Sequence, residues 1–420
     1  MYLFRRFIRE EEALELSIPE LSDGFVAEVV PGTELRDADR VGMKEAAGNE
    51  AGLVPVSYFT ERVLPGIYRV DVEFTAKRDI ERLYLFTGRK QLREILSMRA
   101  GERFSGRYYQ SVAEIIPRYR DVVYPVEHLF FTVCTEDADA VCLGECRAER
   151  VSGGRRVFLC GDSTVTDHAG ESPYCPGAGY AAWGQALPAF LDGAAVENQA
   201  HCGLTTEDFL REGHFVLVMR YIREGDICLF QFGHNDQKLA HLWPNGEYPK
   251  NLRRFIREVR QKGAVPVLVT PLARNIWDSE EKYLDLLEEH AQAVRDVADE
   301  KNTALIELHA WSAAWIAGQG MEASCGYFHP EDYTHTNDYG AYRIAEFMAG
   351  ELVRIFPELG LRKNRRSAEE FVPPKKLWER LGKAAGRISD GSRKEQFDCM
   401  EKSTAALLEG IAAAKREAGY

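Results

Sequence analysis

The feature that most constrains the fold is an alternation of short apolar runs with amphipathic segments in the second half of the 420-residue chain. The clearest amphipathic segment covers residues 279–299, where apolar side chains recur at helical spacing and predict a helix. Strand–helix alternation of this kind favours a parallel sheet that is covered by helices on both faces. The five apolar runs, each read as a strand, lie at residues 157–160, 194–197, 226–232, 265–270 and 304–308.

The first 150 residues have a different pattern. Residues 66–74 alternate apolar and polar side chains with period two, and similar runs occur at 80–86 and 128–134. Several short strands without helices between them predict an antiparallel β-sandwich, which would serve carbohydrate binding or oligomerisation. Residues 150–156 contain Ser-Gly-Gly and predict a linker.

The final 60 residues differ again. Residues 361–420 hold 14 basic and 9 acidic side chains, whereas the whole chain has a net charge of −13. The sequence predicts a basic helical tail, which either docks on the acidic body or a second subunit, or stays solvated. We therefore expect three parts, at residues 1–150, 157–357 and 361–420. The overall acidity disfavours a nucleic-acid-binding protein.

The N-terminal residues and the cysteines bear on location. The chain opens without a signal-peptide pattern, and no window approaches the roughly 18 apolar residues of a membrane helix. Nine scattered cysteines favour reduced thiols, so the expectation is a cytoplasmic protein without a membrane partner. Cys142 and Cys146 are spaced C-x3-C, but no second ligand pair comes after them, and core or strand cysteines are the better interpretation than a zinc site.

Polar clusters come after four of the predicted structural units. Because ligands bind at the carboxyl ends of the strands in such a sheet, we expect these clusters to meet on one rim. They lie at residues 161–164 after the first strand, 198–203 after the second, 233–236 after the third, and 332–335 after the fifth strand and its helix.

Three of these residues can form a catalytic triad. Ser163 is a weak nucleophile until a base takes its proton, and His335 can supply that base. Asp332, three residues earlier, can bond the other ring nitrogen and stabilise the imidazolium. Alone, each has a simpler explanation: Ser163 as a helix N-cap, and His335 as a surface or core histidine.

Acyl transfer also needs donors for the oxyanion. The N–H of Gly203, the side-chain amide of Asn235 and the N–H of Ser163 are the candidates. Taken singly, Asn235 would be a turn residue and Gly203 an ordinary left-handed glycine. Their order along the chain, each after its own strand, favours the functional interpretation.

These blocks resemble the SGNH (GDSL) hydrolase superfamily. The blocks are Gly161-Asp162-Ser163, then Gly203, then Gly233-His234-Asn235-Asp236, then Asp332-Tyr333-Thr334-His335. The stretches 161–165, 231–238 and 332–337 are most similar to rhamnogalacturonan acetylesterases. The resemblance covers residues 157–357.

The resemblance implies a flavodoxin-like, three-layer hydrolase domain with a serine nucleophile, no cofactor and no metal. It also implies removal of acetyl groups from plant cell-wall sugars, and some bacterial members carry an N-terminal β-sandwich. The chain departs from the family in two ways. First, many relatives are secreted, whereas this chain shows no export signal, so the expected substrate is an imported oligosaccharide. Second, residues 199–202 match the second block only loosely.

Other residues of the region have alternative interpretations. Cys202 could be a nucleophile, but no separate His/Asn set accompanies it, and His234 is expected to shape its loop. His329 and His335 could be metal ligands, but their i, i+6 spacing matches no helical metal motif. Aromatic rim residues could stack on sugars, although core packing is the commoner fate. These are Tyr180, Trp183, Trp243 and Trp277.

The resulting hypothesis is a serine esterase whose substrate is an acetylated, rhamnogalacturonan- or pectin-derived oligosaccharide. One alternative is a general GDSL esterase or thioesterase that acts on other short acyl groups. Another, of a different class, is a non-catalytic carbohydrate-binding protein. The sequence leaves open whether the chain forms a homo-oligomer.

Overall fold

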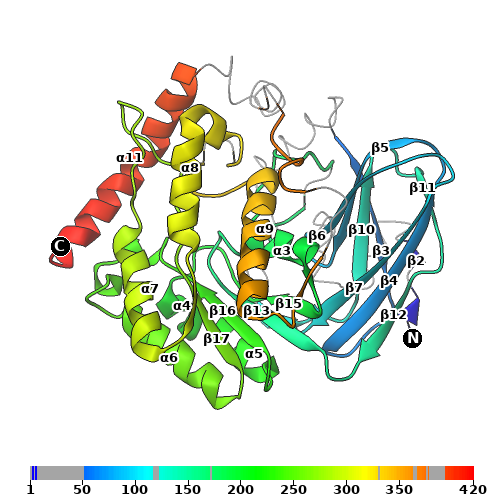
Figure 1. Ribbon diagram of the computed structural model, residues 1–420, viewed down its shortest axis with the longest axis horizontal. Helices are drawn as coiled ribbons and strands as arrows, with labels where there is room; N and C mark the ends of the chain where they lie inside the picture. Colours follow the sequence, from blue (N-terminus) through cyan, green and yellow to red (C-terminus); the bar gives the residue numbers. More distant parts are fainter. Residues whose placement is uncertain are drawn as a thin grey trace.

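The molecule combines an α/β part with two antiparallel sheets on one side and a long C-terminal helix on the opposite side (Figure 1). The structure is a computed structural model. It describes residues 2–3, 5–6, 52–116, 123–170, 173–329, 332–362, 367–374, 377 and 393–420.

The five predicted strands of the second half form one parallel sheet. Its hydrogen-bonded order is β15-β13-β16-β17-β18, so the first strand in the chain lies between the second and the third. This is the flavodoxin-like order, and the prediction of a parallel sheet with helices is confirmed. The strands are β13 (Arg155–Gly161), β15 (Ala194–Asn198), β16 (Ile227–Gln231), β17 (Val265–Val269) and β18 (Ala304–Ile306).

Helices cover both faces of this sheet because its strands are apolar on both sides. Along β13, Leu159 belongs to one buried cluster with Leu187 and Met348, whereas Phe158 belongs to another with Phe255. Successive side chains of a strand point to opposite faces, so β13 has a core above and below it. The helices are α3 (Trp183–Phe190), α4 (Thr206–Arg211), α5 (His214–Tyr221), α6 (Tyr248–Gln261), α7 (Glu288–Lys301), α8 (Leu308–Cys325) and α9 (Asp338–Ile355), with short 3-10 helices η3 (Asp236–Lys238) and η4 (Ala240–Leu242).

The prediction of a helix over residues 279–299 is wrong at its start, because α7 begins only at Glu288. Asp278 Oδ1 accepts the backbone N–H groups of Glu280 and Lys282, each at 2.9 Å. This side chain folds the preceding residues into a turn and satisfies donors that a helix would otherwise use. Tyr283 then pairs with Trp277 in an isolated β-bridge.

Two antiparallel sheets precede the α/β part. Their facing side chains share one buried cluster that includes Val72 and Phe74 from the first sheet and Leu85 and Phe131 from the second. The first sheet contains β1 (Tyr2–Leu3), β12 (Arg147–Val151), β4 (Gly66–Ala76), β11 (Val141–Leu143) and β7 (Arg103–Val112). The second contains β2 (Arg5–Arg6), β3 (Val54–Phe59), β10 (Phe130–Thr135), β5 (Ile80–Thr87) and β6 (Gln91–Met98). Two minor pairs are β8 (Glu114–Ile115) with β9 (Tyr124–Pro125), and β14 (Leu191–Asp192) with β19 (Gly360–Leu361).

The antiparallel sheets and the α/β part are joined by packing as well as by the chain. β6 packs on α3, and β7 lies beside β15, the edge strand of the parallel sheet. Phe86 and Ile95 of the second antiparallel sheet belong to the same buried cluster as Trp183 and Leu187 of α3. The predicted linker at 150–156 is much shorter in the structure, because β12 extends to Val151 and β13 starts at Arg155.

The C-terminal helix α11 (Arg393–Glu417) lies against η3 and η4. It is on the side of the molecule away from the antiparallel sheets (Figure 1). Ile411 and Ala414 pack on Trp243, and Lys415 forms an ion pair with Glu289. Of the described helices, none is both long enough and apolar enough to cross a bilayer.

Candidate active site

Ser163, His335 and Asp332 form a continuous hydrogen-bonded chain. The Ser163 Oγ lies 2.6 Å from His335 Nε2, and His335 Nδ1 lies 2.6 Å from Asp332 Oδ2. The structure therefore brings the three predicted triad residues together, although 172 positions separate Ser163 from His335. In this arrangement, a proton leaving Ser163 has an acceptor and the acceptor has an ionic partner.

The turn after β13 positions Ser163. Asp162 Oδ1 accepts the N–H and the hydroxyl of Thr164 at 2.9 and 2.8 Å, which closes the turn around Ser163. Gln231, at the end of β16, donates to Thr164 Oγ1 at 2.6 Å and accepts from the Trp183 indole at 2.8 Å. Trp183 is thus a buried support of this turn, not an aromatic of the rim.

The turn before α9 positions His335. Asp332 Oδ1 accepts the backbone N–H groups of Thr334 and His335 at 3.0 and 3.1 Å, while its other oxygen bonds the imidazole. Asn337 then caps α9 by accepting from the N–H of Tyr339. The D-x-x-H spacing thus lets one carboxylate shape the turn and orient the ring.

The environment of Asp332 keeps it ionised. Its burial on its own would raise the pKa, but the hydrogen bond and charge of His335 and the two backbone donors lower the pKa well below its usual value. An ionised carboxylate at Nδ1 stabilises the imidazolium that forms when His335 accepts a proton.

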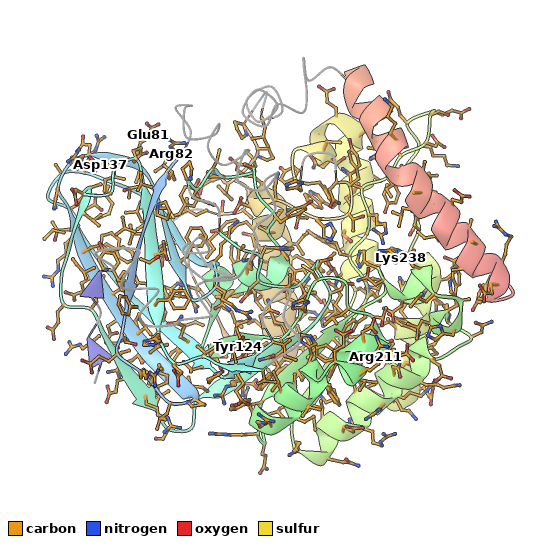
Figure 2. All side chains as sticks on the ribbon, turned by 180° about the vertical axis from the view of Figure 1, so that it is seen from behind. Glu81, Arg82, Tyr124, Asp137, Arg211 and Lys238 are labelled. Atoms are coloured by element: carbon orange, nitrogen blue, oxygen red, sulfur yellow. The ribbon has the colours of Figure 1, made fainter. Side chains whose placement is uncertain are left out.

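The predicted oxyanion donors occupy the ends of the two strands that flank β13. Gly203 comes after β15 with φ +85°, and an added Cβ would meet no atom within 4 Å, so backbone conformation rather than space explains this glycine. Asn235 comes after β16, and its Nδ2 donates to the carbonyl of Leu204 at 3.1 Å. Lys238 in η3, which is labelled in Figure 2, donates to Asn235 Oδ1 at 2.9 Å. These bonds fix the amide beside the Gly203 loop and leave one of its two N–H groups for an oxyanion.

His234 is buried against Asp162, the residue before Ser163. It is 2% exposed, its Nδ1 lies 3.3 Å from Asp162 Oδ2, and burial lowers its pKa. The next acidic residue of the block, Asp236, accepts the N–H and hydroxyl of Thr206 at 2.9 and 2.7 Å, and burial raises its pKa to about 7. The His234 ring thus lies against the turn that carries Ser163, and its role in shaping its own loop stays a prediction.

Arg274 is a site residue that the sequence did not single out. Its buried guanidinium donates to the hydroxyl of Thr334, inside the Asp332–His335 turn, and to the carbonyl of His234 at 2.9 Å. Burial lowers its pKa to about 10, so it stays charged at neutral pH. A signal for it exists, because Arg274 is the first charged residue after the fourth strand, and the rim rule applies to that strand as well.

Tyr180 and His329 pack against the triad. Their rings stack with centroids 3.7 Å apart, and the Tyr180 hydroxyl donates to Asp332 Oδ2 at 3.4 Å. Both ring nitrogens of His335 are engaged by Ser163 and Asp332, so His329 and His335 are not arranged as a pair of metal ligands.

The remaining candidates lie in structural positions. Trp243 and Trp277 are buried rather than displayed on the rim. Cys142 is exposed, whereas Cys146 is buried against the backbone of Glu73, and burial raises its pKa to about 11. Cys142 is thus a strand cysteine in β11 and Cys146 is a core cysteine, which is the interpretation that the sequence favoured.

The α/β part of the chain is similar to a known family and to known proteins. A model of the GDSL-like Lipase/Acylhydrolase family matches residues 159–340. Rhamnogalacturonan acetylesterase RhgT of Bacillus subtilis (strain 168) is 35% identical over 222 residues, which cover 49% of this chain and 91% of that protein. The probable rhamnogalacturonan acetylesterase YesY of the same organism is 32% identical over 214 residues, which cover 49% of this chain and 94% of the relative.

Among solved structures, protein YxiM of Bacillus subtilis is 24% identical, with a TM-score of 0.45, over 71% of this chain and 80% of that chain. The family model and the relatives show that the chain is a carboxylic ester hydrolase and belongs to the GDSL-like lipase/acylhydrolase family, within the SGNH hydrolases.

Proposed function

We propose that the protein is a carbohydrate acetylesterase that removes acetyl groups from oligosaccharides derived from plant cell walls, with rhamnogalacturonan fragments as the first candidates. The observation that carries the proposal is the Ser163–His335–Asp332 chain with 2.6 Å between each bonded pair. The sugar assignment is supported by the names of the two rhamnogalacturonan acetylesterases described above.

The proposed acylation step uses this geometry. The Ser163 Oγ attacks the acetyl carbonyl carbon while His335 Nε2 takes the hydroxyl proton, and Asp332 stabilises the imidazolium. The N–H of Ser163, the N–H of Gly203 and the Asn235 amide donate to the oxyanion. When the tetrahedral intermediate collapses, the bond to the sugar oxygen breaks, and His335 returns its proton to that oxygen.

Deacylation reverses these roles. His335 takes a proton from water as the water oxygen attacks the acetyl-serine carbonyl. Collapse of the second intermediate then returns the proton to Ser163 Oγ and releases acetic acid, which loses its remaining proton to the solvent and becomes acetate. His335 thus carries the proton between the reacting oxygens in both steps.

Two measurements test this proposal. The Ser163→Ala variant should lose hydrolysis of p-nitrophenyl acetate, and wild-type rates in that variant would refute the nucleophile. Acetate release should then be compared among acetylated rhamnogalacturonan, xylan and homogalacturonan oligosaccharides. Equal rates on all three would remove the preference for rhamnogalacturonan.

The alternatives give different results. A general GDSL esterase or thioesterase would keep its activity as the acyl chain lengthens, whereas a sugar deacetylase should prefer acetyl. A carbohydrate-binding protein without catalysis would not react with a fluorophosphonate at Ser163. The cytoplasmic location stays a prediction from the sequence, and the oligomeric state stays open.

A further inference from the structure

We propose that Lys90, on a turn of the antiparallel sheets, is a positioning residue for the catalytic triad, and that its turn (residues 88–91) is part of the esterase site. This inference rests on the proposed function. The turn joins β5 to β6 and lies outside the region that matches the family model.

The burial of the Lys90 side chain is not explained by the folding of a hairpin alone. It is 2% exposed and has φ +58°, the left-handed region that a non-glycine residue seldom adopts. Burying an ammonium group and holding a strained backbone both cost free energy, and such features persist where the surrounding structure fixes them. Because buried charges and strained backbone cluster at functional sites, we expect the contacts of Lys90 to have a functional explanation.

The Lys90 ammonium joins two segments of the hydrolase. It donates to the carbonyl of Tyr180 at 3.2 Å and lies 3.8 Å from Asp338 Oδ1. Asp338 also accepts from the Tyr174 hydroxyl at 3.0 Å and from the N–H of Gly177 at 2.9 Å. Lys90 therefore holds the loop of residues 174–182 against the start of α9.

That loop contacts the triad directly. The Tyr180 hydroxyl donates to Asp332 Oδ2, the same oxygen that bonds His335, and the ring meets His335 edge-on at 5.6 Å. The next residue, Ala181, exchanges two hydrogen bonds with Thr336, at 3.0 and 2.6 Å. A shift of the Tyr180 backbone would thus move groups on both sides of His335.

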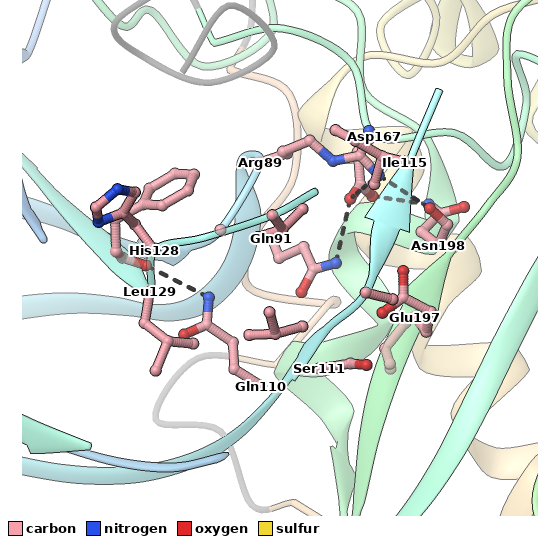
Figure 3. Close-up of a pocket in the computed structure, with 16 residues that line it drawn as sticks. Arg89, Gln91, Gln110, Ser111, Ile115, His128, Leu129, Asp167, Glu197 and Asn198 are labelled. Atoms are coloured by element: carbon pink, nitrogen blue, oxygen red, sulfur yellow. Dashed lines mark hydrogen bonds and ion pairs between the residues drawn. The ribbon is translucent and has the colours of Figure 1, made fainter. Parts of the chain in front are cut away.

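The neighbours of Lys90 reach the other catalytic loops. Arg89 donates to the carbonyl of Asn198 at 2.9 Å and lies 3.6 Å from Asp167 Oδ2, and Gln91 donates to that same oxygen at 3.1 Å. Asn198 in turn donates to the carbonyl of Val165, two residues after Ser163, at 2.8 Å. Figure 3 shows Arg89, Gln91, Asp167 and Asn198 around the polar pocket between the antiparallel sheets and β15.

The decisive experiment compares Lys90→Met with Lys90→Arg and with the control Lys77→Met. The methionine keeps the length of the side chain but loses the ammonium, and Lys77 is an exposed lysine in the bend between β4 and β5. We expect Lys90→Met to lower kcat by about ten- to a hundred-fold with KM little changed, because misplacement of catalytic groups acts on the chemical step. Lys90→Arg should recover much of the loss, and Lys77→Met should match the wild type.

The rate of Ser163 phosphonylation by a fluorophosphonate gives a readout that does not depend on the natural substrate. A slower rate in Lys90→Met, with a wild-type far-UV spectrum and cooperative melting, supports positioning. A wild-type rate overturns the inference. If Ser163→Ala itself keeps esterase activity, the proposed function fails instead, and the two failures are thereby distinguished.

Tyr180→Phe covers the case in which Lys90→Met does not fold. This variant keeps the ring and removes only the hydroxyl that bonds Asp332. A lower kcat supports the path from Lys90 through Tyr180 to Asp332, and a wild-type kcat overturns it. Where both single variants fold, the double variant should lose less than the product of the two single losses, and full multiplicativity would contradict the shared path.

Discussion

The two segments on either side of the family-matched region both reach the loops of the site, but through different kinds of contact. The turn at residues 88–91 uses buried polar and charged groups, with Lys90 and Arg89 bonded to backbone carbonyls. Helix α11 uses mainly apolar packing on Trp243 beside η3 and η4, and its ion pair between Lys415 and Glu289 is partly exposed. Buried hydrogen bonds depend on direction, whereas apolar burial does not. We therefore expect the turn to control geometry and the helix to contribute stability.

The largest effect should come from the triad itself, and it sets the scale for both segments. Asp332→Asn should lower kcat by about 10⁴-fold, because an amide can hold His335 in the wrong tautomer. Initial rates with p-nitrophenyl acetate measure this loss, with Asp137→Asn, an exposed carboxylate of the antiparallel sheets, as the control. A loss smaller than that of Lys90→Met would reverse the proposed order of importance.

The pH dependence of stability should separate the two segments by sign. Burial raises the pKa of Asp167, which bonds Gln91, from its ordinary value of 3.8 to about 6. The folded state therefore binds the proton of the Asp167 carboxyl more tightly than the unfolded state does. The stability that this bound proton contributes at low pH is lost as the pH rises from about 4 to 6. This loss amounts to about 3 kcal/mol. Urea unfolding at pH 4 and pH 7 should show a smaller decrease in Asp167→Asn than in the wild type.

At the C-terminal contact the sign is opposite. Burial of Glu289 would raise its pKa, but the hydrogen bond and charge of Lys415 lower that pKa overall. This pair therefore stabilises the fold above the pKa of Glu289 in the unfolded state, and that stability is lost as pH falls.

The outcome that would contradict the Asp167 prediction is an equal pH dependence of unfolding in Asp167→Asn and the wild type. It would mean that Asp167 does not bind a proton in the folded state as predicted.

Shortening an apolar side chain of α11 should affect stability without affecting the rate. Ile411 is 7% exposed in the cluster with Trp243, and Ile411→Ala should lower the free energy of unfolding by about 2 kcal/mol. The kcat well below the melting temperature should stay at the wild-type value. Leu361→Ala, which shortens an exposed apolar side chain, is the matched control. A selective loss of kcat in Ile411→Ala would show that the helix also controls geometry.

The smallest effect should come from the ion pair of α11. The side chains of Lys415 and Glu289 are 40% and 34% exposed, and exposed pairs of this kind contribute less than about 1 kcal/mol. Lys415→Ala should therefore lower the melting temperature slightly at low ionic strength and not at all at high salt. An effect that persists in high salt would identify the contact of Lys415 with the Trp243 ring, at 5.7 Å, as the stronger one.

The sequence predicted the parts of the site that depend on local pattern. Ser163 and Asn235 follow apolar runs that are buried on both faces, so the rule that ligands bind at the carboxyl ends of strands predicts them as site residues. His335 lies just before helix α9, in the polar cluster that follows the fifth strand and its helix. The same rule, applied to the fourth strand, points to Arg274. The start of α7 was missed because the turn at Asp278 is made by a side chain that apolar periodicity does not register.

The turn at residues 88–91 could not be predicted in the same way. In sequence, Gly-Arg-Lys-Gln between two strands is an ordinary solvated hairpin turn. Its contacts with Asn198, Tyr180 and Asp338 join positions 90 or more residues apart, and only the packing of β6 on α3 brings them together. Long-range polar contacts of this kind leave no periodic trace in a single chain.

The buried cluster that contains Phe86 and Ile95 together with Trp183 and Leu187 has a practical consequence for protein engineering. A catalytic fragment cut near residue 157 would expose the apolar face of α3 that β6 now covers, and exposed surface of this kind drives aggregation. For the same reason, the antiparallel sheets cannot be exchanged for those of a relative unless the residues facing α3 are exchanged with them. The modules that the sequence delineates are therefore not independent units for domain shuffling.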